Sequence, residues 1–377
     1  MTPPTRVPTG LYVHWPCCAR VCPYCDFNVT RARGVDEDAW TAAFEADLAH
    51  LRARFGPRPL VSLYFGGGTP SLMSDGLIGR VAVAADRLFG LMPGAEVTLE
   101  ANPNDIGEAR LRGWRAAGVN RLSLGVQSFD DGQLAFLGRD HDGEAARRAV
   151  EMMLGAFERS TFDLIYALPG EGAADWSARL EDALATGVRH LSLYQLTVEP
   201  GTAFARAVSR GDWTPTGEDL DADLYEATAA RTSARGLPPY EVSSHAEPGH
   251  EAVHNALYWQ GADWLAIGPG AHGRLTTHEG RVATEGARGI GGYLKVPPGT
   301  RLAEEALSPG EALTERVAGG LRMIAGLPLA SVDAPLARAA QPLIEDGLLT
   351  LHADRLAATP AGRLVLDAVT AALLSRL

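Results

Sequence analysis

The sequence predicts an α/β fold: a parallel sheet that curls into a partial (β/α)6 barrel, followed by a smaller winged-helix-like domain. Two observations predict it. Short β-rich runs alternate six times with longer amphipathic segments, which is typical of successive βα units. Polar or glycine-rich residues follow the runs, and functional residues of parallel α/β folds lie at the carboxyl ends of the strands.

The predicted barrel elements follow one another from residue 11 onward. The predicted strands are 11–15, 61–65, 96–100, 121–126, 161–167 and 190–197. The segments between them place apolar residues at helical spacing and include 37–54, 106–117, 143–157 and 174–186. Strands that alternate with helices form parallel sheets, so we expect these six strands to lie in one sheet.

The chain changes character at residue 240, where the core domain predicted for 1–240 ends. Half of the ten histidines lie between residues 244 and 279, and a strand-like run covers 264–267. We expect the segment 241–300 to close the barrel and to continue into a linker, 296–310, that is rich in proline, glycine and charge.

The carboxy-terminal domain is predicted for residues 301–377. A helix over 311–324, a further helix, a hairpin over 347–358 and a last helix over 360–374 suggest a winged-helix-like module. Because the chain is acidic, we expect this module to serve as a packing or lid domain and not in DNA binding.

All four cysteines lie between Cys17 and Cys25. Cys18, Cys22 and Cys25 read C-x3-C-x2-C, a spacing that wraps three thiolates around one centre. A structural zinc site usually takes four protein ligands from two separated pairs, and a disulfide is disfavoured in a reduced compartment, so the spacing favours a [4Fe-4S] cluster. Cys17 breaks this spacing and is interpreted as a small buried apolar residue.

Glycines and carboxylates stand at the ends of the predicted strands. The run Gly66–Ser71 follows the second strand, Glu100 ends the third, and Asp163 lies in the fifth. Glycine lets the backbone approach a ligand closely, and a carboxylate can meet an amine or ribose hydroxyls. The alternatives are a tight βα turn for the glycines and capping or ion-pair roles for the carboxylates.

Composition excludes several classes of function. The net charge of -12 opposes nonspecific binding to nucleic acid or to anionic membranes. Lys295 is the single lysine, so no P-loop is available. The first ten residues contain no apolar signal region and no stretch of about 18 apolar residues occurs, so we expect a cytoplasmic protein without a transmembrane segment.

Several motifs together resemble those of the oxygen-independent coproporphyrinogen III oxidase-like branch of the radical S-adenosylmethionine proteins. The resemblance covers nearly the whole chain. Besides the cysteines, the motifs are Tyr12-Val13-His14-x-Pro16, Gly66–Ser71, Glu100–Pro103, Gly125–Phe129, Leu137–His141, Asp163–Tyr166 and His254-Asn255-x-x-Tyr258-Trp259.

The resemblance implies a role for each matching position. Cys18, Cys22 and Cys25 would bind the [4Fe-4S] cluster, whose open iron takes the methionyl amine and carboxylate of S-adenosylmethionine. The residues that would contact this cosubstrate are Tyr12, Gly67, Gly68, Thr69 and Glu100. Gln127, Arg139 and Asp163 match positions that hold a second cosubstrate molecule in the oxidase branch.

Within this family the motifs are most similar to the members that act as haem chaperones. The oxidase has a further cysteine two residues beyond the third, where this chain has Phe27, and a longer amino-terminal segment. The resemblance implies haem binding, acceptor haemoproteins as partners, and a reductase or flavodoxin as electron donor. The alternative is an enzyme that cleaves S-adenosylmethionine, either decarboxylating coproporphyrinogen III or methylating a substrate.

His254 is the expected haem ligand. Histidine is a common axial ligand of haem iron, and Tyr258 and Trp259 could pack against a flat macrocycle. A hydrogen-bonded core histidine is the alternative. His250 would share a face with His254 if the segment is helical, and His245 and His272 are further candidates for a second ligand.

Overall fold

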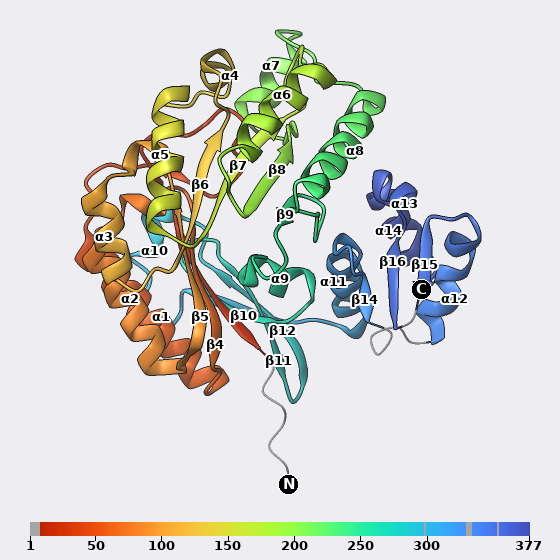
Figure 1. The fold of residues 1–377 in the computed structure, drawn as a ribbon. Helices are drawn as coiled ribbons and strands as arrows, with labels where there is room; N and C mark the ends of the chain where they lie inside the picture. Colours follow the sequence, from red (N-terminus) through yellow and green to blue (C-terminus); the bar gives the residue numbers. More distant parts are fainter. Residues whose placement is uncertain (1–7, 298, 329–333, 353) are drawn as a thin grey trace.

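A computed structural model describes residues 8–297, 299–328, 334–352 and 354–377 (Figure 1). An open sheet of eleven strands dominates it, in the order β13-β12-β11-β10-β1-β4-β5-β6-β7-β8-β9. Its strands are β1 (Thr9–Trp15), β4 (Leu60–Gly67), β5 (Leu91–Ala101), β6 (Arg121–Gln127), β7 (Arg159–Tyr166), β8 (His190–Gln195), β9 (Ser244–Ala246), β10 (Asp263–Ile267), β11 (His272–Thr277), β12 (Gly280–Gly286) and β13 (Leu302–Ala306). A short parallel pair, β2 (Cys17–Cys18) and β3 (Thr30–Arg31), stands apart.

The six predicted strands are all present and lie side by side in parallel as β1 and β4 to β8. β10 adds a further parallel strand beside β1, whereas β9, β11, β12 and β13 are antiparallel to their neighbours. The open sheet confirms the α/β class and the partial barrel, and it is wider than the sequence predicted.

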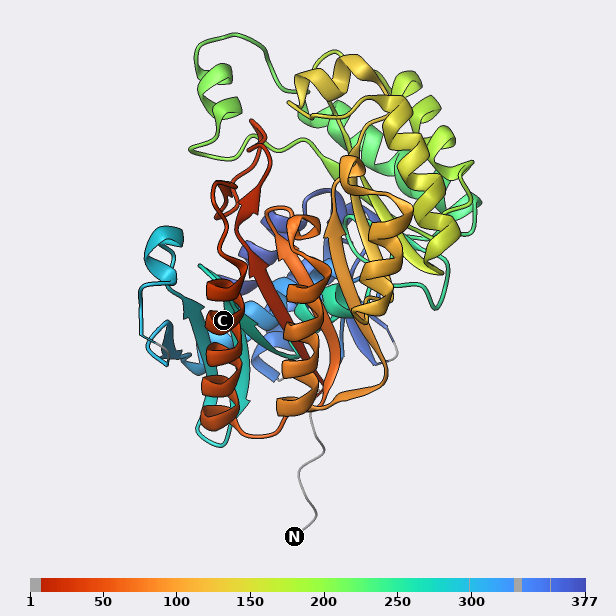
Figure 2. The same cartoon turned by 90° about the vertical axis from the view of Figure 1, so that its left-hand side faces the viewer.

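Helices cover one face of the sheet, as Figure 2 shows for α1, α2 and α3. The helices of this part are α1 (Glu37–Phe55), α2 (Asp75–Phe89), α3 (Glu108–Ala116), α4 (Asp131–Phe136), α5 (Gly143–Ala156), α6 (Ala173–Leu184), α7 (Ala203–Ser209), α8 (Glu218–Ala234), α9 (Val253–Trp259) and α10 (Ile290–Tyr293). Local signals set their ends: the Asp36 side chain accepts a hydrogen bond from the Ala39 amide at the start of α1. Gly56, with φ at 73°, ends that helix in a conformation that glycine adopts readily.

The carboxy-terminal part has its own hydrophobic core around Val317, Leu321 and Leu356. It contains α11 (Pro309–Arg322), β14 (Leu327–Pro328), α12 (Ala334–Glu345), β15 (Leu349–His352), β16 (Arg355–Ala358), α13 (Pro360–Leu364) and α14 (Leu366–Leu374). The hairpin β15–β16 confirms the predicted hairpin, and β14 extends it into a three-stranded sheet. In Figure 1 this part lies beyond α9, away from α1 to α3.

Two predicted segments were wrong in detail. The predicted linker 296–310 contains β13, which pairs with β12 at the edge of the large sheet. The sequence did not indicate this strand because it lacks a buried apolar pattern. It lies at the edge of the sheet, is paired on one side only and carries exposed glutamates. The predicted last helix divides at Val365, whose φ of -124° and ψ of 35° are not helical.

No helix in the described ranges is long and apolar enough to cross a membrane.

Candidate functional site

The cysteine loop begins directly after β1 and is closed at its base by β2 and β3. The amide of Thr30 donates to the carbonyl of Pro16 at 2.7 Å, and that of Ala32 donates to the carbonyl of Cys18 at 2.7 Å. Within the loop, the Cys25 amide bonds to the Cys22 carbonyl at 3.2 Å. Backbone bonds therefore hold the three cysteines on one compact loop.

A cavity of about 360 Å³ lies at the carboxyl ends of the parallel strands, beside this loop. It brings together nearly all of the predicted site residues: Cys18, Cys22, Cys25, Gly67, Gly68, Thr69, Glu100, Gln127, Arg139 and Asp163. The expected functional edge of the sheet is thus where the cavity lies. Tyr12 and His254 do not line it.

Glycines let β4 approach the cysteine loop. A Cβ atom on Gly68 would stand 2.8 Å from the Cys17 carbonyl oxygen and 2.9 Å from Cys18 Sγ, so a side chain there would collide with the loop. Gly67 adopts φ at 113°, and its Cβ would lie 2.6 Å from the His14 ring. The Gly68 amide in turn donates to the Trp15 carbonyl at 2.7 Å. The glycine run therefore serves close packing against the cysteine loop.

The cysteine loop fits a [4Fe-4S] cluster by its donor set. All four cysteines are free, and three of them line one cavity. Among the described residues no group of three or more His, Cys, Asp or Glu side chains is arranged to hold a metal ion. The thiolates of a [4Fe-4S] cluster bind different irons and so need to surround a cavity.

Cys17 differs from the other three cysteines, because it is 5% exposed and belongs to the main hydrophobic core.

Burial raises the pKa of Cys18 to about 11, with further increases from Cys25 and Cys22, while a hydrogen bond with Thr69 lowers it. Metal binding at Cys18 must therefore displace its proton.

Two carboxyl groups stand in the cavity wall. Burial, together with nearby Asp163, raises the pKa of Glu100 to about 7, against the lowering effect of its hydrogen bonds with Tyr64 and Gly67. The Tyr64 hydroxyl donates to Glu100 at 2.7 Å and the Gly67 amide donates at 3.0 Å. Burial raises the pKa of Asp163 to about 6, although Ser192 and two arginines lower it. These hydrogen bonds fix Glu100 at the strand end.

Arg139 and Gln127 complete the polar wall. Arg139 Nη1 donates to Cys22 Sγ at 3.4 Å and Nη2 donates to the Gly125 carbonyl at 2.8 Å. Its Nε is buried without a hydrogen-bond partner. Gln127 ends β6 with φ at 68°, a conformation that is uncommon for residues other than glycine and is concentrated at functional sites.

Tyr12 faces a second cavity and not the first. Its hydroxyl forms a hydrogen bond with His14 Nδ1 at 3.0 Å, and its ring lies beside Tyr64 and His254. This second cavity shares Phe27, Gly67 and Glu100 with the first, so the two adjoin.

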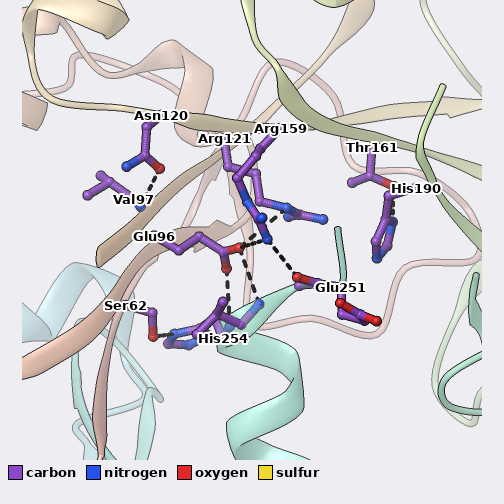
Figure 3. A network of polar contacts seen from close by, with 12 residues as sticks. Ser62, Glu96, Val97, Asn120, Arg121, Arg159, Thr161, His190, Glu251 and His254 are labelled. Carbon is purple, nitrogen blue, oxygen red and sulfur yellow. Dashed lines mark hydrogen bonds and ion pairs between the residues drawn. The ribbon is translucent and has the colours of Figure 1, made fainter. Parts of the chain in front are cut away.

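His254 is a buried residue whose ring faces Ser62 (Figure 3). Nδ1 bonds to the Ser62 hydroxyl at 2.8 Å and Nε2 to the Tyr258 hydroxyl at 2.7 Å, and the residue is 1% exposed. Burial, with Arg121 nearby, lowers the pKa of His254 to about 3, so the ring is neutral. Haem ligation by His254 stays a prediction, and it would require one of these hydrogen bonds to break.

The other candidate histidines lie apart. His250 precedes α9, which begins at Val253, so the expected shared helical face does not exist. His245 is 2% exposed and bonds to the Thr232 hydroxyl at 2.9 Å. His272 lines the second cavity. Most of this cavity could not be predicted from the sequence motifs, because its lining residues come from β11, α11 and α14 and form no local pattern.

Comparison with known proteins places the chain in a family. The model of the radical SAM superfamily matches residues 12–183, and that of the HemN C-terminal domain matches residues 307–365. The heme chaperone HemW of Mycobacterium tuberculosis is 39% identical, over 99% of this chain and 97% of that protein. The mitochondrial radical S-adenosyl methionine domain-containing protein 1 of Bos taurus is 37% identical, over 98% and 88%.

The solved structure of coproporphyrinogen III oxidase (HemN) from Escherichia coli has a TM-score of 0.81 at 23% identity and covers 99% of this chain and 91% of its own. It supports the fold. The chain is thus a radical SAM protein with a HemN-type carboxy-terminal domain. More narrowly, it belongs to the HemN-like family that includes the heme chaperone HemW, as the motifs indicated.

Proposed function

We propose that this protein is a haem chaperone, which binds haem and passes it to acceptor haemoproteins. The observation that carries the proposal is the 39% identity to the heme chaperone HemW of M. tuberculosis along nearly all of both chains. The likeness to HemN concerns the fold, and a fold alone does not define a reaction. Phe27, at the position of the oxidase's additional cysteine, also favours the chaperone.

The first cavity is proposed to hold the cluster and S-adenosylmethionine. Cys18, Cys22 and Cys25 would hold a [4Fe-4S] cluster, which supplies an open iron for the methionyl amine and carboxylate. Thr69 and the glycines beside it would bring backbone groups close to the cosubstrate. Gln127, Arg139 and Asp163, which match the positions of a second cosubstrate molecule in the oxidase branch, line the same cavity and supply an amide, a guanidinium and a carboxyl group. A direct contact from Tyr12 stays a prediction, because its hydroxyl bonds to His14.

Glu100→Ala should weaken S-adenosylmethionine binding about ten-fold or more, because a hydrogen bond to a charged group contributes roughly 1.5–3 kcal/mol. The carboxyl group lines the cavity and has a pKa of about 7, so binding that depends on its anion should also weaken as pH falls below about 7. Calorimetric titration of the cluster-loaded protein with S-adenosylmethionine at several pH values measures both effects.

Glu108→Ala is the control for Glu100→Ala, because its side chain is 78% exposed. Glu100→Gln keeps a hydrogen-bonding group and should remove the pH dependence. An unchanged dissociation constant in Glu100→Ala would assign Glu100 to structure.

The enzyme alternative is tested directly. Reduced, cluster-loaded protein is incubated with coproporphyrinogen III and S-adenosylmethionine, and a parallel sample is loaded with haem and mixed with an apo-haemoprotein. A chaperone should transfer haem and form no protoporphyrinogen IX. Formation of protoporphyrinogen IX at catalytic turnover would establish the oxidase instead.

The proposal extends to partners and location. A reductase or flavodoxin is proposed as the electron donor, and the cytoplasm as the compartment. The division into 1–240, 241–300 and 301–377 is proposed as the domain organisation. The separate hydrophobic core supports the division of the carboxy-terminal part from the rest, with the boundary after β13, because this strand pairs with the large sheet.

A further inference from the structure

The second cavity lies between the barrel and the carboxy-terminal part. Its volume is about 1040 Å³, which reaches the upper end of the roughly 300–1,000 Å³ typical of ligand sites. β11 forms one side of it, α11 and α14 form another, and the end of α9 contributes Tyr258 and Trp259. A cavity of this size and adjoining the first one suits a large cofactor.

Aromatic side chains line the cavity. The Tyr258 and Trp264 rings lie 4.7 Å apart at 69°, and both residues face the cavity together with Trp259. Such faces provide large apolar contact areas for a flat macrocycle. The aromatic pair of the His254 motif therefore lines this space although His254 itself does not.

Arginines give the cavity a basic wall in a chain of net charge -12. Most of them have carboxylate partners: Arg274 with Glu315 at 2.8 Å, Arg281 with Asp263 at 3.6 Å, and Arg322 with Glu241 at 3.5 Å.

Arg316 is the exception. Its guanidinium forms no ion pair or hydrogen bond with another described residue, and its Nε is buried without a partner. A partly buried guanidinium without a counter-ion is costly, so this position favours an anionic ligand group.

His272 offers a ligand for iron. It is the first residue of β11. Side chains of a strand alternate between its two faces: His272, Arg274 and Thr276 line the cavity, whereas Leu275 is buried on the opposite face. The other histidine of the lining, His14, has both ring nitrogens hydrogen-bonded, to Tyr12 and to Asn28. The His272 ring makes no hydrogen bond with described residues and lies 3.8 Å from Glu285, with its side chain 48% exposed.

From these observations, and resting on the proposed haem function, we propose that the second cavity binds haem, with His272 as an axial ligand and Arg316 as partner of a propionate. The Tyr258, Trp259 and Trp264 side chains contact the macrocycle. This assignment moves the haem site away from the enclosed ring of His254 to the space between the two parts of the chain.

The test titrates the full-length, cluster-loaded protein with ferric haem and, separately, with metal-free protoporphyrin IX. His272→Ala should weaken haem binding about ten-fold or more and shift the Soret band, yet leave protoporphyrin IX binding unchanged, because only the iron contact is lost. Arg316→Gln should weaken both ligands about ten-fold, because the charge-assisted contact to a propionate is lost.

Matched controls are His278→Ala and Arg112→Gln, whose side chains are 89% and 72% exposed. Both should titrate like the wild type. If wild-type protein binds haem and His272→Ala retains its affinity and spectrum, the proposed site is wrong while the chaperone function stands. If the wild type binds no haem, the proposed function itself fails.

Discussion

Cys18→Ala, Cys22→Ala or Cys25→Ala should each abolish the iron–sulfur cluster, whereas Cys17→Ala should spare it. The first three side chains line one cavity and Cys17 does not, so the loss of any one of the three leaves two protein ligands for the cluster. Wild-type protein purified without oxygen should be brown and contain about four irons and four sulfides per chain. Iron and sulfide analysis with visible absorption spectra measures the loss.

Cys17 provides the matched control within the same loop. It is buried in the main core, where a thiol behaves as a small apolar group, so alanine there removes packing and no ligand. Loss of the cluster in Cys17→Ala together with its retention in Cys18→Ala would overturn the ligand assignment.

The barrel was predictable from sequence because its strands are buried runs bounded by glycine and polar residues. β1, for example, is buried at nearly every position and leads straight into the cysteine loop. The exposed strand β13 was not predictable, since its glutamates face solvent and only its pairing with β12 defines it. Local pattern thus identified the central strands and missed this edge strand.

The first cavity was likewise predictable, because residues at the carboxyl ends of parallel strands meet at one edge of the sheet. Glu100 and Asp163 are far apart in sequence yet line the same cavity. The environment of His254 was not predictable, because its Ser62 partner lies 192 residues away and no motif records the contact. The second cavity arises from similarly distant residues, such as His272 and Arg316.

The second large effect concerns Glu96, a buried carboxylate that holds α9 inside the barrel (Figure 3). Its oxygens lie 3.7 Å from Arg121 Nε and 3.3 Å from Arg159 Nη2. They also accept hydrogen bonds from the first amides of α9, at 3.2 Å from Val253 and 3.1 Å from His254. One carboxylate thereby neutralises the buried Arg121 and the positive end of the helix dipole.

Glu96→Ala should therefore lower the free energy of unfolding by about 3–5 kcal/mol, because it leaves a buried arginine without its counter-ion. Glu96→Gln keeps a hydrogen-bond acceptor and should lose less. Glu108→Ala, which removes an exposed i,i+4 ion pair with Arg112, should cost about 1 kcal/mol or less. Urea denaturation followed by circular dichroism measures all three variants. A Glu96→Ala protein as stable as Glu108→Ala would show that α9 is held by its apolar contacts and not by this carboxylate.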